Sequence, residues 1–308
     1  MEKLRVDPSP HISHNDTTDS IMLDVILALF PATICSFFFY GFKAIVLVAA
    51  TVASAVASEY LWCQATKKEP SLRDLSAIVT GLILALTLPP DLPIWMAVLG
   101  GAIAIVLAKQ LFGGLGRNFA NPAIVARIIL TIIFPTAMKT FTVPFTDTVS
   151  SATPLAELSS QTPDLMQLFL GYHPGCMGET SALLLLIGGV YLVIRKVITP
   201  TIPLSFILSA GVFAAILGAN PVATILTGGI MLGAIYMATD YSTSPPTFFG
   251  QIIFGVGCGL ITVIIRVFGI LPEGVAFGIL IMNLLSLPIT KITLPKPFAA
   301  QGKNHIDM

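Results

Sequence analysis

Residues 76–90 read SAIVTGLILALTLPP, an almost unbroken apolar run that ends in two prolines. A helix needs about 20 residues to cross the hydrocarbon of a bilayer, and proline does not continue a helix interior. The same order of features, Thr227-Gly228, an apolar run and then Pro245-Pro246, occurs in the second half of the chain. Short or interrupted apolar segments at corresponding positions of two halves predict inverted repeats with a binding site at their interface.

The composition places the chain in a membrane. Of its 308 residues 55% are hydrophobic and only 10% are charged, the net charge is zero and the mean hydropathy is +0.89. A soluble domain has about 25% charged residues. We therefore predict an integral membrane protein in contact with lipid, and the neutral balance argues against nucleic-acid binding. The polar first twenty residues, MEKLRVDPSPHISHNDTTDS, do not resemble a cleavable signal peptide.

Ten apolar segments are candidate membrane spans. They are residues 22–41, 43–62, 76–90, 94–112, 120–138, 181–198, 202–218, 220–239, 248–270 and 274–292. We predict an all-α integral membrane protein with about ten transmembrane helices, arranged as two inverted five-helix repeats with interrupted helices. The alternative is that glycine and proline are simply frequent in membrane helices.

The repeat continues beyond the double prolines, because Lys109 precedes QLFGGL in the first half and Arg266 precedes VFGIL in the second. An odd number of spans in each half inverts the second copy. The predicted organisation is a cytoplasmic N-terminal segment at 1–20, repeats at 21–138 and 181–295 separated by an external loop at 139–180, and a cytoplasmic tail at 296–308.

Lysine and arginine accumulate on the cytoplasmic side of membrane proteins. With the N-terminus inside, twelve fall on the inner side, at Lys3, Arg5, Lys67, Lys68, Arg73, Lys109, Arg117, Arg195, Lys196, Lys291, Lys296 and Lys303. Three fall outside, at Lys43, Lys139 and Arg266, and Arg127 lies within a span. Both termini are therefore predicted to be cytoplasmic.

The cysteines do not predict a metal site. Cys35, Cys63, Cys176 and Cys258 are far apart in the sequence, whereas zinc and iron–sulfur sites use closely spaced thiolates. We expect the four to be small buried side chains, and no metal ligand is predicted.

A glycine-rich turn, KQLFGGLGRNFANP at 109–122, is the first candidate site. Its glycines, which allow positive φ and close backbone approach, are Gly113, Gly114 and Gly116. If the stretch is helical, the amides of Asn118 and Asn121 face the same ligand, and amides suit a flat heteroaromatic such as a flavin. The alternative is a helix start with Asn121 as N-cap and Pro122 at N1.

The second candidate is MATDYSTSPPT at 237–247, where Asp240 ends a span with no basic neighbour in its own loop. An acidic group near membrane depth is costly and defaults to a functional role. The alternative is a carboxylate that reaches interfacial water while Thr243 and Ser244 cap the turn.

The third candidate is the loop sequence DTVSSATPL at 147–155. Pro154 disfavours helical backbone at Thr153 and directs it towards an extended conformation. The alternative is a helix over 154–160 with Thr153 as N-cap, although Glu157 is one position beyond a capping box.

Several longer motifs carry a resemblance that spans almost the whole chain. They are SPHI at 9–12, MLDV at 22–25, TGLILALTLPP at 80–90, KQLFGGLGRNFANPA at 109–123, SSATPL at 150–155, MATDYSTSP at 237–245 and EGVAF at 273–277. The chain resembles the family of the D subunit of the RNF complex, which is related to the B subunit of the sodium-pumping NADH:quinone oxidoreductase. Its length favours the RNF branch, because the quinone-reducing relative usually has a longer N-terminal region.

The resemblance implies that Thr153 carries FMN through a phosphodiester bond made by a separate flavin transferase. The family pattern D-x-x-S-x-A-T is matched by Asp147, Ser150, Ala152 and Thr153, and Pro154 follows it. Ser151 stands where many members have glycine. It also implies a non-covalent flavin, riboflavin or FMN, near Asn118 and Asn121. The remaining candidate contacts to a flavin are Gly113, Gly114, Asp240 and Thr243.

By this resemblance the chain is one subunit of an ion-translocating oxidoreductase in the cytoplasmic (inner) membrane of a bacterium or archaeon, and it is not catalytic alone. The complex moves electrons between reduced ferredoxin and NAD⁺ and exports Na⁺ or H⁺. The chain has no clustered cysteines and no dinucleotide-binding G-x-G-x-x-G after a strand, so we expect other membrane and flavin or iron–sulfur subunits to bind both substrates. Lys109, Arg127, Asp240 and Arg266 are candidate coupling charges.

Three alternatives are open at this point: a component of the quinone-reducing enzyme, a urea-channel-like solute channel, and a scaffold subunit without cofactor. A covalently bound flavin on a denaturing gel separates the redox subunits from the channel and the scaffold.

Overall fold

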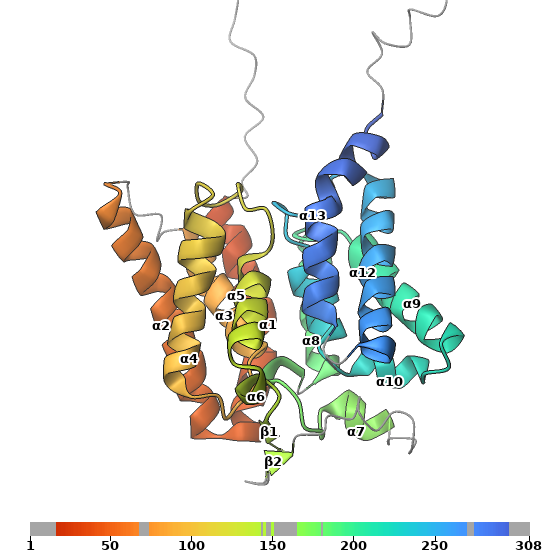
Figure 1. The fold of residues 1–308 in the computed structure, drawn as a ribbon, viewed down its shortest axis with the longest axis horizontal. Coiled ribbons are helices and arrows are strands. Elements are labelled where there is room, and N and C mark those ends of the chain that lie inside the picture. Colours follow the sequence, from red (N-terminus) through yellow and green to blue (C-terminus); the bar gives the residue numbers. More distant parts are fainter. Residues whose placement is uncertain are drawn as a thin grey trace, which may run out of the picture.

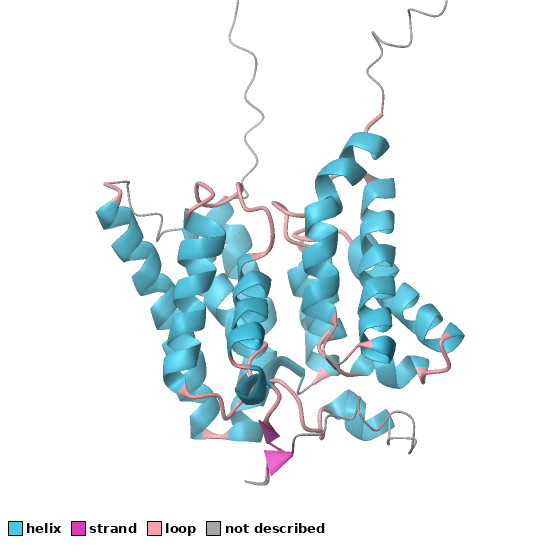
Figure 2. Cartoon of the chain, viewed as in Figure 1, coloured by secondary structure: helices cyan, strands magenta, loops and turns pink. Residues whose placement is uncertain are grey.

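A computed structural model of the chain describes residues 17–67, 74–142, 144, 145, 149, 150, 165–179, 181–269 and 274–295. These residues are mostly helical (Figure 2). The elements of the first half are α1 (Thr18–Tyr40), α2 (Phe42–Ala65), α3 (Ser76–Leu86), α4 (Ile94–Ile103), the π-helical η2 (Ala104–Gln110), α5 (Pro122–Ile133) and α6 (Pro135–Met138). They form the left side of the molecule in Figure 1.

The second half lies beside the first (Figure 1). Its elements are α8 (Ala182–Ile194), α9 (Thr201–Ile216), α10 (Pro221–Leu226), α11 (Ile230–Leu232), the π-helical η4 (Gly233–Met237), α12 (Phe248–Phe268) and α13 (Val275–Thr293). Between the halves come β1 (Phe141–Thr142), β2 (Val149–Ser150), α7 (Leu165–Leu170) and the 3₁₀ turn η3 (Met177–Glu179). The strands are antiparallel, and Phe141 pairs with Ser150.

Each predicted apolar segment coincides with at least one helix, and the helix is interrupted or shortened in three of them: 76–90, 220–239, and 120–138, which is divided between α5 and α6. The segment 76–90 is helical only to Leu86, and Thr87 is its C-cap. The two prolines that follow lie in a turn, as their missing amide donors require.

The segment 220–239 is broken in its middle. Gly228 and Gly229 have φ of 64° and 72°, in the left-handed region, so α10 ends at Leu226 and the chain restarts as a helix at Ile230. Residues with side chains rarely adopt this conformation, which is why the break falls on a Gly-Gly pair. Non-helical backbone at membrane depth is tolerated where protein covers it.

The two halves meet through α1 against α8 and through α5 against α13. Asp24 of α1 accepts hydrogen bonds from the Tyr191 hydroxyl of α8 at 2.7 Å and from Nε of Arg195, the C-cap of α8, at 3.2 Å. Tyr236 of η4 donates between the same helices, where the carbonyls of Ala28 and Leu185 each lie 3.2 Å away. The contact between the halves is therefore polar at several levels as well as apolar.

Small residues set the closest helix packing within the second half, where α9 packs along α12. A Cβ added to Gly255 would collide with Ser205 Oγ, and one added to Gly259 would collide with Ser209 Oγ. Small side chains that allow close backbone approach are typical of helix pairs in membranes.

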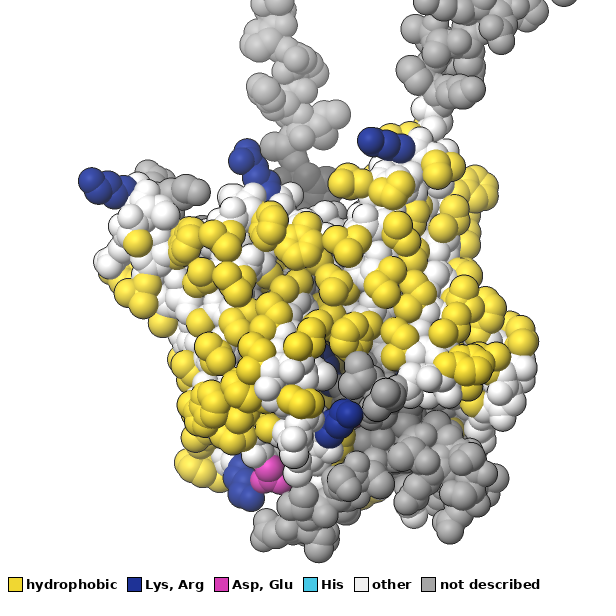
Figure 3. Space-filling model, in the orientation of Figure 1, with side chains coloured by type: hydrophobic (Ala, Val, Ile, Leu, Met, Phe, Trp, Pro, Cys, Tyr) yellow, Lys and Arg dark blue, Asp and Glu magenta, His cyan; other side chains and the backbone are white. Residues whose placement is uncertain are grey.

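The outside of the helices is apolar. Figure 3 shows hydrophobic side chains over the middle of the face in view, with Lys and Arg side chains nearer the upper and lower edges. By length and composition, α1, α2, α12 and α13 can each cross a membrane, and shorter apolar helices accompany them. This arrangement fits a protein whose exterior contacts lipid.

Candidate functional site

A cavity of about 410 Å³ lies between α1, α3, η4 and the turns that follow η2 and η4. Sites for small molecules and cofactors measure about 300–1,000 Å³ and combine apolar walls with a few polar groups. The polar side chains that line this cavity include Ser76, Lys109, Asn118, Asn121, Asp240 and Ser242. The structure thus brings together four of the candidate residues, Lys109, Asn118, Asn121 and Asp240, although Asp240 is far from the other three in the sequence.

The glycine-rich turn forms part of the cavity wall. Gly113, Gly114 and Gly116 all have positive φ, of 113°, 96° and 80°. This backbone returns the chain from η2 towards the start of α5, and it places Gly116 against the cavity. Gly113 and Gly114 do not line the cavity, so their contribution is the shape of the turn.

The two asparagines have different environments. Asn121 Oδ1 accepts from Ala123 N at 3.0 Å as the N-cap of α5, and its Nδ2 donates to Met237 O at 3.2 Å, across the interface between the halves. Asn118 lies in non-helical backbone, because the glycine turn runs up to it, so the condition for a shared helical face is not met and the alternative, Asn121 as N-cap, holds. Asn118 Oδ1 is buried without a hydrogen-bond partner in the described residues, and an acceptor left open beside a cavity suits a ligand donor.

Asp240 lies at the rim of the cavity, in the turn that follows η4. Its carboxylate accepts from Ser242 N at 3.3 Å, from Ser242 Oγ at 3.1 Å and from Thr243 Oγ1 at 3.3 Å. Burial raises the pKa of Asp240, and these hydrogen bonds oppose the shift. Thr243 is buried behind the carboxylate and does not line the cavity.

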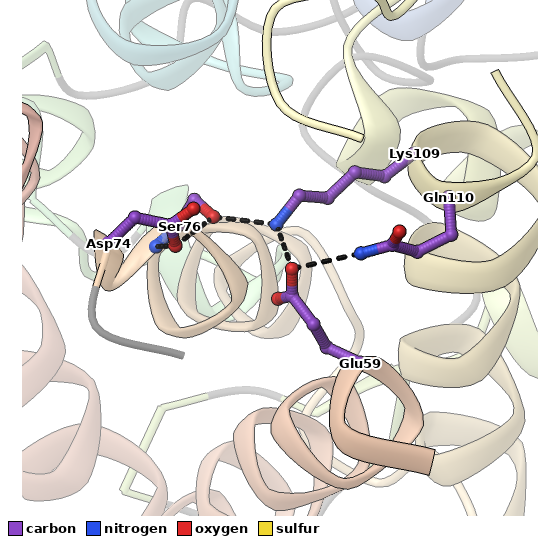
Figure 4. Close-up of polar contacts among 5 residues, drawn as sticks. All are labelled: Glu59, Asp74, Ser76, Lys109 and Gln110. Carbon is purple, nitrogen blue, oxygen red and sulfur yellow. Dashed lines mark hydrogen bonds and ion pairs between the residues drawn. The ribbon is translucent and has the colours of Figure 1, made fainter. Parts of the chain in front are cut away.

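Lys109 is the centre of a buried polar cluster on the first-half side of the cavity (Figure 4). Its Nζ donates to Glu59 Oε1 at 2.7 Å and to Ser76 Oγ at 2.6 Å. Gln110 Nε2 also donates to Glu59 Oε1, at 3.0 Å, and Asp74 accepts from Ser76 Oγ at 2.6 Å. These bonds join α2, η2 and the start of α3, and Lys109 and Ser76 present the cluster to the cavity.

Lys109 is one of the charges expected from the sequence, whereas its partner Glu59 is not. The signal was present, because Glu59 is an acidic residue inside the apolar segment 43–62. The pairing itself could not be read from the sequence, since fifty residues separate the two side chains.

Arg127 and Arg266, the other two candidate charges, lie elsewhere. Arg127 Nη2 donates to Cys176 Sγ at 3.3 Å. Arg266 donates to three backbone carbonyls at the helix break, those of Thr224 at 2.7 Å, Thr227 at 3.0 Å and Gly228 at 2.8 Å.

The expectation that the cysteines are buried is wrong at one position, Cys35. Cys176 does not act only as a small apolar side chain, because a guanidinium contacts its thiol. Cys35 is not fully buried, whereas Cys63 and Cys258 are.

Arg127, Cys176 and Glu179, together with Arg266 at the helix break, form a second polar cluster. Glu179 is buried, and a Cβ added to Gly229 would lie 3.5 Å from its Oε1. Arg127, Cys176, Glu179, Gly228 and Gly229 surround a hollow of only about 20 Å³, which is the size of a water molecule and not of an organic ligand. This cluster stabilises the helix break. The guanidinium of Arg266 binds the carbonyls at the end of α10, and the carboxylate of Glu179 lies beside Gly229, where the chain turns into α11.

Asp147, Ser151, Thr153 and Pro154 lie outside the described residues. The strand pair fixes the chain just before Ser151, Thr153 and Pro154, because β2 ends at Ser150, three residues ahead of Thr153.

The chain is similar to known proteins over almost its full length. The model of the NQR2, RnfD, RnfE family matches residues 5–299. The chain is similar to the D subunit of the Na⁺-translocating ferredoxin:NAD⁺ oxidoreductase complex of Acetobacterium woodii, with 46% identity over 94% of this chain and 93% of the relative. It is 37% identical to the D subunit of the proton-translocating ferredoxin:NAD⁺ oxidoreductase complex of Clostridium ljungdahlii, over 96% of both chains. It is 38% identical to the D subunit of the ion-translocating oxidoreductase complex of Stutzerimonas stutzeri, over 93% of this chain and 94% of the relative.

Proposed function

The chain belongs to the NQR2, RnfD, RnfE family, and we propose that it is the flavin-carrying membrane subunit of an ion-translocating ferredoxin:NAD⁺ oxidoreductase complex. The observation that carries the proposal is the 46% identity, over nearly the full length of both chains, to the D subunit of a sodium-translocating complex of that kind. As one subunit, it works with the other membrane and electron-transfer subunits of the complex and is not catalytic alone.

The 410 Å³ cavity is the proposed site of a non-covalent flavin, riboflavin or FMN. Three observations support the fit: the apolar wall suits an aromatic ring system, the volume suits a cofactor, and the open acceptor of Asn118 suits an imide N–H. Asn121 holds the wall together across the two halves, and Lys109 and Asp240 add one basic and one acidic side chain to the lining. A flavin bound there supplies one- and two-electron transfer, while the protein supplies its position and its electrostatic surroundings.

We place the second flavin on Thr153 as a covalent FMN. The motif with Asp147, Ser150 and Ala152 supports this assignment, and a separate flavin transferase makes the bond. A tethered cofactor cannot be lost by dissociation, which matters on an external face that has no flavin pool.

The helix packing supports the proposed inverted repeat of 21–138 and 181–295. The pairing of α2 with α3 and α4 corresponds to that of α9 with α10 and α12. In the contact between the halves, α1 packs on α8 and α5 packs on α13. Each pair joins corresponding helices, the first or the last of the two repeats, as a two-fold axis between the halves requires. Lys109 and Arg266 also correspond, since each bonds to the interrupted third element of its own half.

The charge asymmetry supports the orientation of this repeat. In Figure 1, β1, β2 and α7 lie at the lower edge, opposite the end of α13. With the lower edge external, the loop that carries Thr153 is outside and both termini are inside. The two clusters around Lys109 and around Arg127 and Arg266 then lie towards opposite sides of the membrane, where they are the proposed coupling charges for Na⁺ or H⁺.

The proposal is tested by in-gel flavin fluorescence after denaturation, with the chain expressed beside a flavin transferase. The wild-type band should fluoresce, and Thr153→Ala should abolish the signal. Thr162→Ala is the matched control, because Thr162 is followed by Pro163 in the same loop.

Retention of fluorescence in Thr153→Ala would refute the attachment site and direct attention to Ser150 or Ser151. A wild-type band without fluorescence in a host that makes the transferase would instead favour a channel or a scaffold subunit.

A further inference from the structure

A small recess at the external edge of the molecule is separate from both clusters described above. It has a volume of about 130 Å³, and Phe39, Lys43, Asp91, Thr142 and Phe145 are among the residues that line it. The recess therefore joins the end of α1, the start of α2, the turn after α3 and strand β1.

Three aromatic rings contact one another beside this recess: Phe39 and Phe145 line it, and Tyr172, which does not line it, packs on both. The ring centroids of Phe39 and Phe145 are 4.9 Å apart and those of Phe39 and Tyr172 are 5.4 Å apart. The rings of Phe145 and Tyr172 are 5.9 Å apart and inclined by only 31°. Phe39 is 8% exposed, whereas Phe145 is 63% exposed and Tyr172 51%. Two large rings thus stand partly in solvent on a buried third ring.

Phe145 is held in this position by a strained backbone conformation. Its φ is +62°, a left-handed conformation that is rare for a bulky residue, and its N–H donates to Phe39 O at 3.2 Å. The bond ties the segment after β1 to the end of α1, so the exposed ring does not result from an unconstrained chain.

The recess also has a polar side. Lys43 Nζ lies 3.0 Å from Asp91 Oδ1, which places a strong donor and a strong acceptor next to each other beside the rings. Flat heterocycles with adjacent carbonyl and N–H groups match this combination of aromatic faces and paired polar groups.

We propose that the isoalloxazine ring of the flavin carried at Thr153 stacks on the exposed rings of Phe145 and Tyr172, with its pyrimidine edge in the recess. The inference rests on the proposed covalent attachment and adds the residues that receive the ring. Stacking on Phe145 and Tyr172 would cover the aromatic faces, and the pyrimidine carbonyls and N–H would contact Lys43 and Asp91.

The length of the tether supports this occupant. Ser150 pairs with Phe141, the neighbour of Thr142 in the recess. Thr153 follows three residues later, and three extended residues span about 10 Å at most. A ring attached there, with its own ribityl chain as a further tether, begins next to the recess, and its effective concentration at the recess is high.

The test uses the full-length chain, purified in detergent after co-expression with a flavin transferase, in three variants. Phe145→Leu and Tyr172→Leu remove one exposed ring each. Phe249→Leu is the matched control, because Phe249 is also an exposed aromatic with a ring neighbour, Phe248, but lies at the start of α12. Denaturing gels measure attachment, and iodide quenching of native flavin fluorescence measures docking, with Thr153→Ala as the background.

We expect equal gel fluorescence in all three variants. The quenching constant should rise by about twofold to tenfold in Phe145→Leu and Tyr172→Leu, the factor that one aromatic contact provides, and should not change in Phe249→Leu. Unchanged quenching with intact attachment overturns the recess alone and implies that lipid or a partner protein covers the rings. Absence of the covalent flavin from the wild-type chain overturns the attachment and the recess together.

Discussion

Lys109 Nζ lies 2.7 Å from Glu59 Oε1, and the two side chains are 2% and 0% exposed. The pair joins α2 to the last turn of η2, and through Ser76 it reaches the start of α3. A buried ion pair of this kind is stabilising only relative to a state in which one partner is left without the other. Because the two charges cancel, the pair can be buried beside the cavity without leaving an uncompensated charge there.

Removing one member of this pair should be more harmful than removing both. Glu59→Gln leaves a buried ammonium and Lys109→Met leaves a buried carboxylate, each at a cost of about 3 kcal/mol. The double variant should recover part of the loss. The measurement is the thermal unfolding temperature in detergent, with Lys67→Met at the exposed end of α2 as the control. Additive losses in the double variant would show that the two side chains do not act as a pair.

Asn118 and Asn121 should both be needed for the non-covalent flavin, for different reasons. Asn118→Ala removes the acceptor that faces the cavity, while Asn121→Ala removes the N-cap of α5 and the bond to Met237. Flavin extracted by acid from the purified chain should fall in both variants, and covalent flavin should be unchanged.

Asn220→Ala is the control for the loss of a cap. Asn220 caps α10 and is followed by Pro221, as Asn121 is by Pro122, but it does not line the cavity. The extra cost of a lost cap is about 1 kcal/mol in either case. If Asn220→Ala lowers the extractable flavin as much as Asn118→Ala does, the cavity is not the flavin site.

The bond between Asp24 and Arg195 should stabilise the contact of the two halves. Asp24 is 7% exposed and accepts from Tyr191 as well as from Arg195, so Asp24→Ala takes the acceptor from both donors. Loss of a hydrogen bond to a charged group costs about 1.5–3 kcal/mol. Asp24→Ala should therefore lower the unfolding temperature, whereas Asp19→Ala, at the exposed start of α1, should have little effect. Equal effects of the two changes would contradict this role.

Asp240 should make stability depend on pH. Because burial raises its pKa in the folded chain, the folded state holds this proton more strongly than the unfolded state does. Stability should therefore fall as the pH rises from the ordinary carboxyl value of about 4 through the raised pKa. Asp240→Asn removes this contribution, so the difference in unfolding temperature between the variant and the wild type should grow with pH across that window. A difference that is constant with pH would exclude the titration of Asp240.

The orientation is checked by labelling intact cells with an impermeant maleimide. A cysteine introduced at Gln167, which is exposed on α7, should react, and one introduced at Thr66, which is exposed at the end of α2, should react only after the cells are opened. The wild-type chain, whose cysteines are mostly buried, gives the background. The reverse pattern would place the Thr153 loop in the cytoplasm.

Local features of the site could be predicted from the sequence, because their causes lie within a few residues. The Asn121-Pro122 pair fixes the start of α5 through its own cap and proline geometry, and the glycines at 113 and 114 set the turn by their φ. The break at 227–229 has the same kind of local cause.

The pairings between distant residues could not be predicted. Glu59 and Lys109, or Arg266 and the Thr224 carbonyl, meet only because α2, η2, α10 and α12 pack together, and a sequence pattern gives no distance between helices. The environment of Asn118 has a related cause: positive φ at Gly116 turns the chain away from a helix, so Asn118 and Asn121 do not share a helical face.

Arg266 gives the broken helix a property that a dissolved ion could not. Exposed carbonyls at such a break attract cations, and a free cation that satisfied them would come and go with the composition of the medium. A guanidinium that belongs to the chain stays through dialysis, chelation or a change of salt. The lower half of the protein therefore keeps a constant charge at its break, while the cavity beside Asn118 is open to exchange.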